Sequence, residues 1–529
     1  MKRRDFVKHA AAMSALAWMP PLPEFSLHDL NWNAGQVDHI LPTANHERFL
    51  IKVSLREPIQ AVPVLTAGRT LVNGQKTDSQ GFFWTFDVTG LQPATEYELS
   101  LTASKKPLCD SWKLKTFPAP GDLPDRLRVL IYTCAGGHDR LRAHEGRRLL
   151  SPKREKLLTR ALSYRPDALI AIGDQVYWDL RGNGAARKGL SAAPPELAMP
   201  FDRDKPVVGT PNELALRDAA GPQIVPLYST RLRSTPVFFF HDDHDYFEND
   251  EASDYFISFP PDPFNLELSR TLQSWYYPEF LPDHNRPANL GGSSAGDKAP
   301  GVSECFGTLR YGRLAELLMY DCRRFLSLKG PTGQFVPQET ERWISRRVQD
   351  NEVLHTVNIP STPMGWTAGK WGEWYPDYLN VEGKLTDQLN KPYWQSGWNS
   401  QHDRILRAIS ANQRKIPLMI SGDLHAIGAT RIQRSNMEEF SAHPVVSILA
   451  GPLGADGWPS GYRGTKPLPP KSLDVAQDIE ALEENGFVLA DFTPGTVEVH
   501  FFRFSPDRDS EDLIADLLPF KTLTYNRHD

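Results

Sequence analysis

Short apolar runs, each ending in a small or polar residue, recur along the second part of the chain, a pattern typical of buried strands. Four of them are predicted as strands: Leu127–Thr133, Asp167–Ile172, Thr235–Phe240 and Ile416–Ser421. A helical period over Lys153–Ser163 separates the first two, and this β-α-β order predicts adjacent parallel strands whose tips share one edge. Open α/β sheets bind ligands outside the carboxyl ends of their strands. The residues directly after these strands are therefore the candidates for chemistry.

The part of the chain before these strands has a different pattern, with short alternating strands separated by turns. Phe49–Leu55, Gly81–Val88 and Glu96–Thr102 are three of them, and together they predict a β-sandwich. The segment Leu91–Tyr97 is similar to the tyrosine corner of fibronectin type III-like domains, in which a tyrosine hydroxyl binds upstream backbone. Pro118–Gly121 is predicted as the linker out of this support domain.

Beyond the fourth strand, Pro444–Ala450, Gly486–Asp491 and Thr496–Arg503 are predicted as strands that complete a second sheet. Two Pro/Gly-rich segments without sustained period, 182–226 and 259–301, are predicted as irregular loops. Because both follow strand-tip clusters, we expect them to overhang the site.

The length of 529 residues favours two or three domains, and a hydrophobic content of 40% allows a large core. The formal net charge of −6 argues against a general nucleic-acid binder, so no stable nucleic-acid partner is expected. Apolar runs stay shorter than the roughly 20 residues of a membrane span. The four cysteines, Cys109, Cys134, Cys305 and Cys322, have no zinc-knuckle spacing and leave disulfide connectivity open.

The N-terminus has the pattern of an export signal. Met1–Lys8 contains Arg3 and Arg4 followed by an aromatic, an aliphatic and a lysine, and the apolar stretch Ala10–Pro20 comes next. This resembles a bacterial twin-arginine signal, although a basic, amphipathic first helix is the alternative. We expect the twin-arginine export machinery as a partner and a periplasmic, extracellular or cell-envelope location.

Each predicted strand tip carries a different set of polar side chains. Cys134 follows the first strand, and Asp174 and Tyr177 follow the second after a glycine turn. Asp242–Asp245 lies in a dense ionisable run after the third strand, whose mutual repulsion would favour a bound cation. The fourth strand leads to Asp423-x-His425, which a continuing strand would place on one face and a turn after Gly422 would direct inward. Taken singly, each has a structural alternative, such as a turn aspartate, a packed tyrosine or a core cysteine.

Together the four clusters resemble the PhoD-like alkaline phosphatase/phosphodiesterase family, within the calcineurin-like and purple-acid-phosphatase-like metallophosphoesterases. Leu317–Arg324 also resembles the family's strand bearing Asp-x-Arg, and Gln338–Ile344 the helix start that follows it. The resemblance implies a four-layer αββα metallophosphoesterase sandwich preceded by an N-terminal fibronectin III-like β-sandwich, an α/β (α+β) fold. It divides the chain into a twin-arginine signal and leader (1–30), a β-sandwich domain (40–118) and a catalytic domain (125–529).

The resemblance also implies a binuclear metal site. A ferric ion would be held by Cys134, Asp174, Tyr177 and His425. Asp174 would bridge to a second site with Asp243 and Asp423, for Ca²⁺ or another divalent cation. Asp243 replaces the usual Asn, and Asn249 and Asp250 stand where the family often has paired asparagines. Further positions expected near the substrate are Asp242 and Arg323.

The activity implied is hydrolysis of phosphodiesters, phosphomonoesters or both, by a hydroxide held between two cations. His244, beside a metal ligand, is the candidate proton donor to the leaving alkoxide. Two alternatives stay open: an iron-dependent redox enzyme using the same ligands, and an exported non-catalytic ligand-binding protein.

Overall fold

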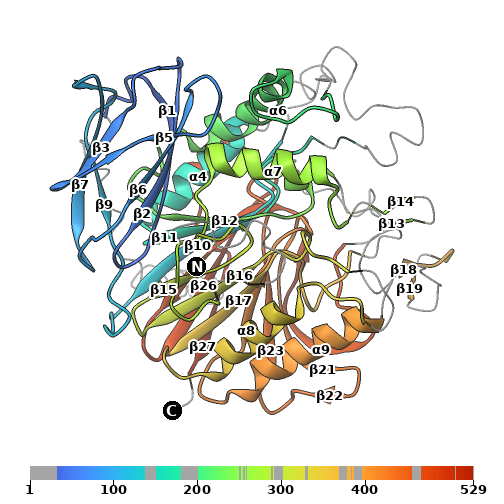
Figure 1. Ribbon diagram of the computed structural model, residues 1–529. Helices are drawn as coiled ribbons and strands as arrows, with labels where there is room; N and C mark the ends of the chain where they lie inside the picture. Colours follow the sequence, from blue (N-terminus) through green and yellow to red (C-terminus); the bar gives the residue numbers. More distant parts are fainter. Residues whose placement is uncertain are drawn as a thin grey trace, which may run out of the picture.

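The computed structural model describes residues 32–137, 151–178, 180, 201–248, 252–253, 256–257, 259–287, 290, 302–327, 332–368, 378–382, 384–386, 396–454, 466–506 and 508–527. Figure 1 shows a small β domain beside a larger body of two sheets with helices on their outer sides.

The N-terminal domain consists of two antiparallel sheets. The first has the order β1-β2-β6-β5, with bounds Val37–Ala44, Phe49–Leu55, Phe83–Val88 and Gln75–Lys76. The second has the order β4-β3-β7-β8 with β9 on β7, and its bounds are Thr70–Asn73, Val64–Ala67, Glu96–Ala103, Lys106–Pro107 and Trp112–Lys115. The Tyr97 hydroxyl accepts the backbone N–H of Gln92 at 2.7 Å, so the tyrosine binds upstream backbone as predicted.

The first large sheet has the order β12-β11-β10-β25-β26-β27. Its strands are Val237–Phe240, Ala168–Ile172, Leu127–Thr133, Asn485–Phe492, Thr496–Phe504 and Lys521–Asn526. The predicted parallel pairing of β10 and β11 is present, and β12 continues it. The expectation that Gly486–Asp491 and Thr496–Arg503 belong to the second sheet is wrong: β25 pairs antiparallel with β10 and β26 follows it.

The second large sheet has the order β15-β16-β17-β20-β23-β21-β22, with β24 also paired to β21. Its strands are Phe306–Tyr311, Ala315–Tyr320, His355–Pro360, Leu418–Ser421, Val445–Ala450, Ile427–Ser435, Glu438–Glu439 and, for β24, Leu473–Leu482. The central strands β16, β17, β20 and β23 are parallel, so their carboxyl ends share one edge.

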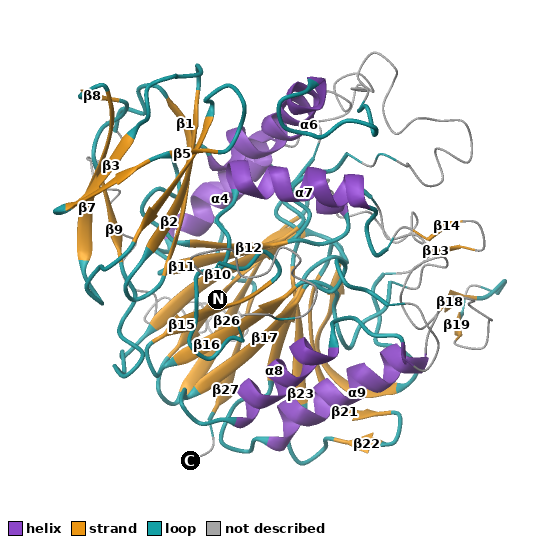
Figure 2. Cartoon of the chain, in the orientation of Figure 1, coloured by secondary structure: helices purple, strands orange, loops and turns teal. Residues whose placement is uncertain are grey.

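Strands buried on both faces explain why the apolar runs are continuous. In β10, Val129 and Ile131 pack into a core shared by both large sheets, while Leu130 and Tyr132 pack outward toward helices α4 (Ser151–Ser163) and α6 (Pro211–Tyr228). Figure 2 shows α4, α6 and α7 (Pro263–Tyr276) on the outside of the first sheet. Helices α8 (Gln338–Gln349) and α9 (Ser396–Ala411) cover the second.

Helix α7 and all but the last two residues of α6 lie inside segments predicted as irregular loops, and there the prediction is wrong. Each helix begins with a proline directly after a capping residue: the Thr210 side chain accepts the N–H of Asn212, and Asp262 accepts those of Phe264 and Asn265. Proline is favoured in the first helical turn, where its missing N–H costs nothing. Prolines also stand inside α6, which hides its periodicity. None of the described helices is long and apolar enough to cross a membrane.

Candidate metal centre

The parallel order of β10, β11 and β12 brings three loops to one edge of the first sheet. Cys134 directly follows β10, Asp174 follows β11 after Gly173, and Asp242 lies two residues beyond β12. The fourth loop comes from the second sheet. The Asp423 N–H donates to the Thr133 hydroxyl at 3.1 Å, which holds this loop against the end of β10. The two sheets therefore meet at their strand tips.

Four of the predicted ligands occupy left-handed backbone conformations: Cys134 (φ 49°), Asp174 (φ 58°), Asp423 (φ 67°) and His425 (φ 49°). For non-glycine residues such conformations are uncommon and concentrate at functional sites. They also show that the expected continuation of the fourth strand through Asp423 and His425 is wrong, because β20 ends at Ser421. The sharp turn, rather than strand alternation, directs both residues to the site.

A first donor group surrounds one point. The Cys134 thiol donates to Asp174 Oδ2 at 3.2 Å, the Tyr177 hydroxyl donates to the same oxygen at 3.0 Å, and Tyr177 Oη lies 2.8 Å from His425 Nε2. Thiol, carboxylate, phenol and imidazole thus converge, each from a different position along the chain. The structure brings together all four residues predicted for the ferric ion.

A second donor group contains carboxylates alone. One oxygen from each of Asp174, Asp242, Asp243 and Asp423 lies within 4.8 Å of the others, and Asp174 belongs to both groups. Arg323, fully buried, donates from Nε to Asp242 at 2.7 Å and from Nη2 to Asp423 at 3.0 Å. Asp242 and Arg323, expected near the substrate, therefore lie among the carboxylates themselves.

The His244 ring contacts the Tyr177 ring, and their centroids are 4.2 Å apart. It also forms a third possible metal-binding group with Asp174 and Asp243. The predicted proton donor is therefore close enough to the carboxylates to serve as a ligand as well.

Burial and mutual repulsion act against negative charge in this cluster. Burial, reinforced by the Asp243 carboxylate, raises the pKa of Asp174 well above its ordinary value. Burial and the Asp174 charge likewise raise the pKa of the Cys134 thiol and the Tyr177 phenol. Within the described part of the chain, Asp174 Oδ1 and Asp242 Oδ2 are buried without a hydrogen-bond partner. A cation would neutralise the repulsion and engage these oxygens, so the residues fit a metal.

Several supporting residues escaped prediction. The Asp245 carboxylate accepts the backbone N–H groups of Asp174 (2.6 Å), Gln175 (2.8 Å) and Asp242 (3.0 Å), and so joins two of the loops. Its position in the ionisable run was visible, but its bonds to backbone across two loops were not. Gln223 of α6 binds a third loop, and its segment had been predicted as irregular.

Two more positions were predicted near the site. Asn249 and Asp250, expected beside the calcium ion or the substrate, lie outside the described residues.

The chain is therefore a mixed α/β protein with a candidate metal site at the tips of its strands. The family model of the PhoD-like phosphatases matches residues 226–501, somewhat more than half of the chain. The chain therefore belongs to the PhoD-like phosphatase family, which confirms the resemblance and supports a phosphoric ester hydrolase.

A solved structure of PhoD is similar to this chain with a TM-score of 0.57 and 14% identity, covering 96% of this chain and 92% of that one. At this identity the likeness shows the fold. The type III pullulan hydrolase from Thermococcus kodakarensis, covering 73% of this chain and 60% of its own, aligns with a TM-score of 0.13 and 10% identity, too low to carry an argument. No curated protein matches the sequence.

Proposed function

We propose that this protein is an exported metal-dependent phosphoesterase with a binuclear site. The observation that carries the proposal is Asp174, whose carboxylate belongs to both donor groups and so stands where a bridging ligand is needed. Family membership supplies the activity class. Hydrolysis of phosphodiesters, of phosphomonoesters or of both is compatible with this site.

We propose Fe³⁺ for the group of Cys134, Asp174, Tyr177 and His425, because phenolate and thiolate favour a trivalent ion over a divalent one. Ca²⁺ or another hard divalent cation suits the group of Asp174, Asp243 and Asp423, whose ligands are all oxygens. Bound there, the two cations supply Lewis acidity at phosphorus and activate the attacking water.

The chain's own side chains have further roles in this proposal. His244, at the edge of the carboxylate group, delivers a proton to the leaving alkoxide. Arg323 neutralises Asp242 and Asp423 and keeps both carboxylates oriented. A substrate phosphate would bring additional negative charge, which the buried guanidinium and the cations offset.

The remaining parts of the proposal concern export and architecture. The twin-arginine pattern supports export of the folded, metal-loaded protein to the periplasm or cell envelope. The finer architecture proposed is a four-layer αββα sandwich preceded by a fibronectin III-like domain. The arrangement of α4, α6 and α7 on one sheet and α8 and α9 on the other supports the layers.

The test is metal content and a visible spectrum on protein exported through its own signal, with assays on a chromogenic phosphodiester and a phosphomonoester. We expect about one iron per chain, a tyrosinate band that disappears in Tyr177→Phe, and loss of hydrolysis in Asp174→Ala. Tyr320→Phe is the matched control, because Tyr320 is a buried tyrosine of β16. A folded, metal-free and colourless protein would support the ligand-binding alternative, and bleaching of the band during turnover would support a redox enzyme.

A further inference from the structure

Gln223 is a buried carboxamide of helix α6 that faces the loops after β10 and β11. Its Oε1 accepts the backbone N–H groups of Gly137 and Tyr177, both at 2.9 Å. Its Nε2 donates to the Ala219 carbonyl, one turn earlier in the helix, at 3.0 Å. Because an amide nitrogen can only donate, this bond within the helix keeps the oxygen directed at the loops.

The two bound backbone groups belong to loops that carry proposed ligands. Gly137 lies three residues beyond Cys134, and Tyr177 is itself a ligand candidate. The loops also touch directly, since a Cβ added at Gly136 would lie 2.7 Å from Cδ2 of the Tyr177 ring. A shift of either backbone would therefore move the phenol relative to the thiol.

The same helix holds the second loop at another point. The Tyr228 hydroxyl, at the end of α6, donates to Oε1 of Gln175, and Nε2 of Gln175 donates to the Gly173 carbonyl at 2.7 Å. The Tyr228 side chain is itself held, because the Tyr132 hydroxyl donates to it at 2.8 Å. Helix α6 thus holds the Asp174–Tyr177 loop at two points, and Gln223 also joins this loop to the Cys134 loop. The two loops are bound directly as well, since the Gly136 N–H donates to the Asp174 carbonyl at 2.9 Å.

We propose that Gln223 is a positioning residue that sets the distance between the Tyr177 hydroxyl and the Cys134 thiol, and thereby the shape of the first donor group. What this group binds rests on the proposed function. The hydrogen bonds themselves exist without metal, so the positioning role can be tested separately.

The variants follow from the geometry. Gln223→Leu keeps the approximate volume but leaves two buried N–H groups without an acceptor. Gln223→Glu is the conservative variant, because a protonated carboxyl in this buried place accepts the same two N–H groups and donates to the Ala219 carbonyl. The matched control is Gln401→Leu: Gln401, fully buried in α9, accepts the N–H groups of Phe335 (2.6 Å) and Val336 (3.3 Å), neither of which belongs to the candidate site.

The first measurement is hydrogen–deuterium exchange on the metal-free proteins. We expect residues 134–137 and 174–178 to exchange roughly tenfold faster in Gln223→Leu, as the loss of a hydrogen bond predicts. Gln401→Leu should leave these segments unchanged and affect 335–336, and Gln223→Glu should resemble the parent protein. Equal exchange of the two ligand loops in Gln223→Leu and Gln401→Leu overturns the inference, whatever the metal measurements show.

The second measurement uses the metal-loaded proteins. We expect Gln223→Leu to bind iron roughly tenfold or more weakly, as is typical when a residue that orients ligands is lost. Its tyrosinate band should shift and its kcat fall with KM little changed, whereas Gln401→Leu lowers the thermal midpoint alone. If the parent protein binds no iron and hydrolyses no ester, the proposed function fails. If the parent is active and Gln223→Leu keeps its band, affinity and kcat, the positioning role fails.

Discussion

Asp174 and Asp245 are neighbouring buried aspartates with opposite surroundings. Asp174 faces other carboxylates, and its pKa is raised in the folded protein. The folded protein is therefore less stable once the pH exceeds the ordinary aspartate pKa, because Asp174 resists losing its proton. At pH 8 we therefore expect metal-free Asp174→Asn to be more stable than the metal-free parent by about 1–2 kcal/mol, a range common for relief of a strained site. Asparagine also tolerates the left-handed backbone there. Urea unfolding in chelator measures the difference, and a less stable variant would contradict repulsion in this cluster.

Asp245 should respond in the opposite direction. Burial raises the pKa of Asp245 to about 7 although three backbone N–H groups favour its ionised form, so at pH 8 the carboxylate is ionised and accepts all three. Asp245→Asn directs an NH₂ group at one of these donors. We expect a loss of about 1–3 kcal/mol, the cost of a buried unsatisfied donor, together with loss of metal binding. The same unfolding experiment checks it, and equal changes in both variants would show that charge alone matters.

At the scale of single residues, the sequence was sufficient to find the donor side chains that lie together, and insufficient to find the residues that support them. Cys134 stands directly after an apolar strand, and Asp423 follows another after one glycine, positions that general rules connect with ligands. Asp245 and Gln223 act by binding backbone of loops distant in sequence, and such bonds leave no periodic pattern. A turn after Gly422 was expected, but the left-handed backbone at His425 was not, because only glycine adopts this conformation readily.

At the scale of elements, the strands were predicted well and their partners less well. Apolar runs mark β25 and β26, but nothing local shows that β25 pairs with β10, more than 350 residues earlier. Helices α6 and α7 were missed because their prolines indicate loops unless the preceding cap is recognised. Pairing and capping both depend on contacts rather than on composition.

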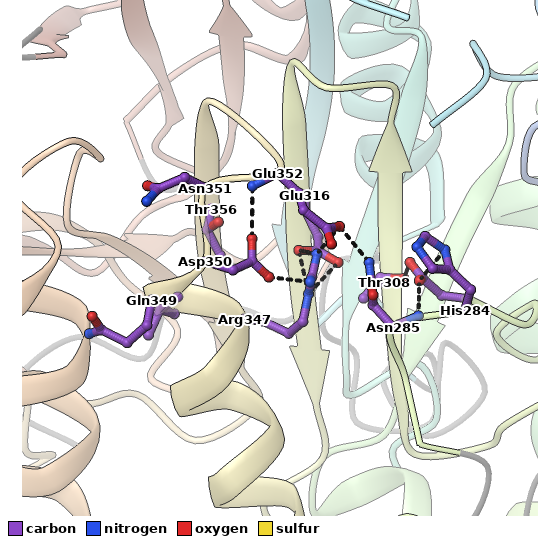
Figure 3. Close-up of polar contacts among 12 residues, drawn as sticks. His284, Asn285, Thr308, Glu316, Arg347, Gln349, Asp350, Asn351, Glu352 and Thr356 are labelled. Atoms are coloured by element: carbon purple, nitrogen blue, oxygen red, sulfur yellow. Dashed lines mark hydrogen bonds and ion pairs between the residues drawn. The ribbon is translucent and has the colours of Figure 1, made fainter. Parts of the chain in front are cut away.

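A network of charged side chains lies at the end of the second sheet away from the candidate metal centre. Its buried lysine allows a test of how burial affects stability. Figure 3 shows Arg347 of α8 between Glu316 of β16, Asp350 and Glu352. Arg347 donates from Nη2 to Glu316 at 2.7 Å. Lys415, before β20, is largely buried beside this network and donates to the Thr356 hydroxyl at 2.6 Å.

Burial lowers the pKa of Lys415 to about 8 from an unfolded value of 10.5. Between these values the unfolded chain binds the additional proton, so this lysine makes the protein more stable as the pH rises from 8 to 10.5. The lowering of this pKa corresponds to about 3 kcal/mol. We expect Lys415→Met to lose this rise in unfolding experiments at pH 8, 9 and 10, and Lys156→Met, which changes an exposed lysine, to keep it. Parallel profiles for the parent and Lys415→Met would contradict the burial argument.

At the scale of the whole molecule, the N-terminal domain supports the helices that support the site. Phe83 stacks on Trp275 of α7 with ring centroids 4.7 Å apart, and the Ile40 N–H donates to the Ser229 carbonyl at the end of α6. Helix α7 in turn packs on the segment 244–246, and Asn265 donates to Glu248 at 2.9 Å. The sequence predicted a support domain and its linker, but not this path, because it depends on two helices that were missed.

One buried ion pair tests that path. Lys52 of β2 lies 2.9 Å from Glu279, just beyond α7, with side chains only 2% and 8% exposed. Removing one partner leaves a buried charge uncompensated, so we expect Lys52→Met to destabilise the protein by about 3–5 kcal/mol. The double variant Lys52→Met/Glu279→Leu should recover most of this loss, because an apolar pair replaces the ion pair.

A calorimetric scan should also show α7 and the N-terminal domain unfolding in one transition in the parent, and separate transitions in Lys52→Met. Additive effects of the two substitutions, or two transitions in the parent, would mean that the N-terminal domain folds beside the two large sheets without stabilising them.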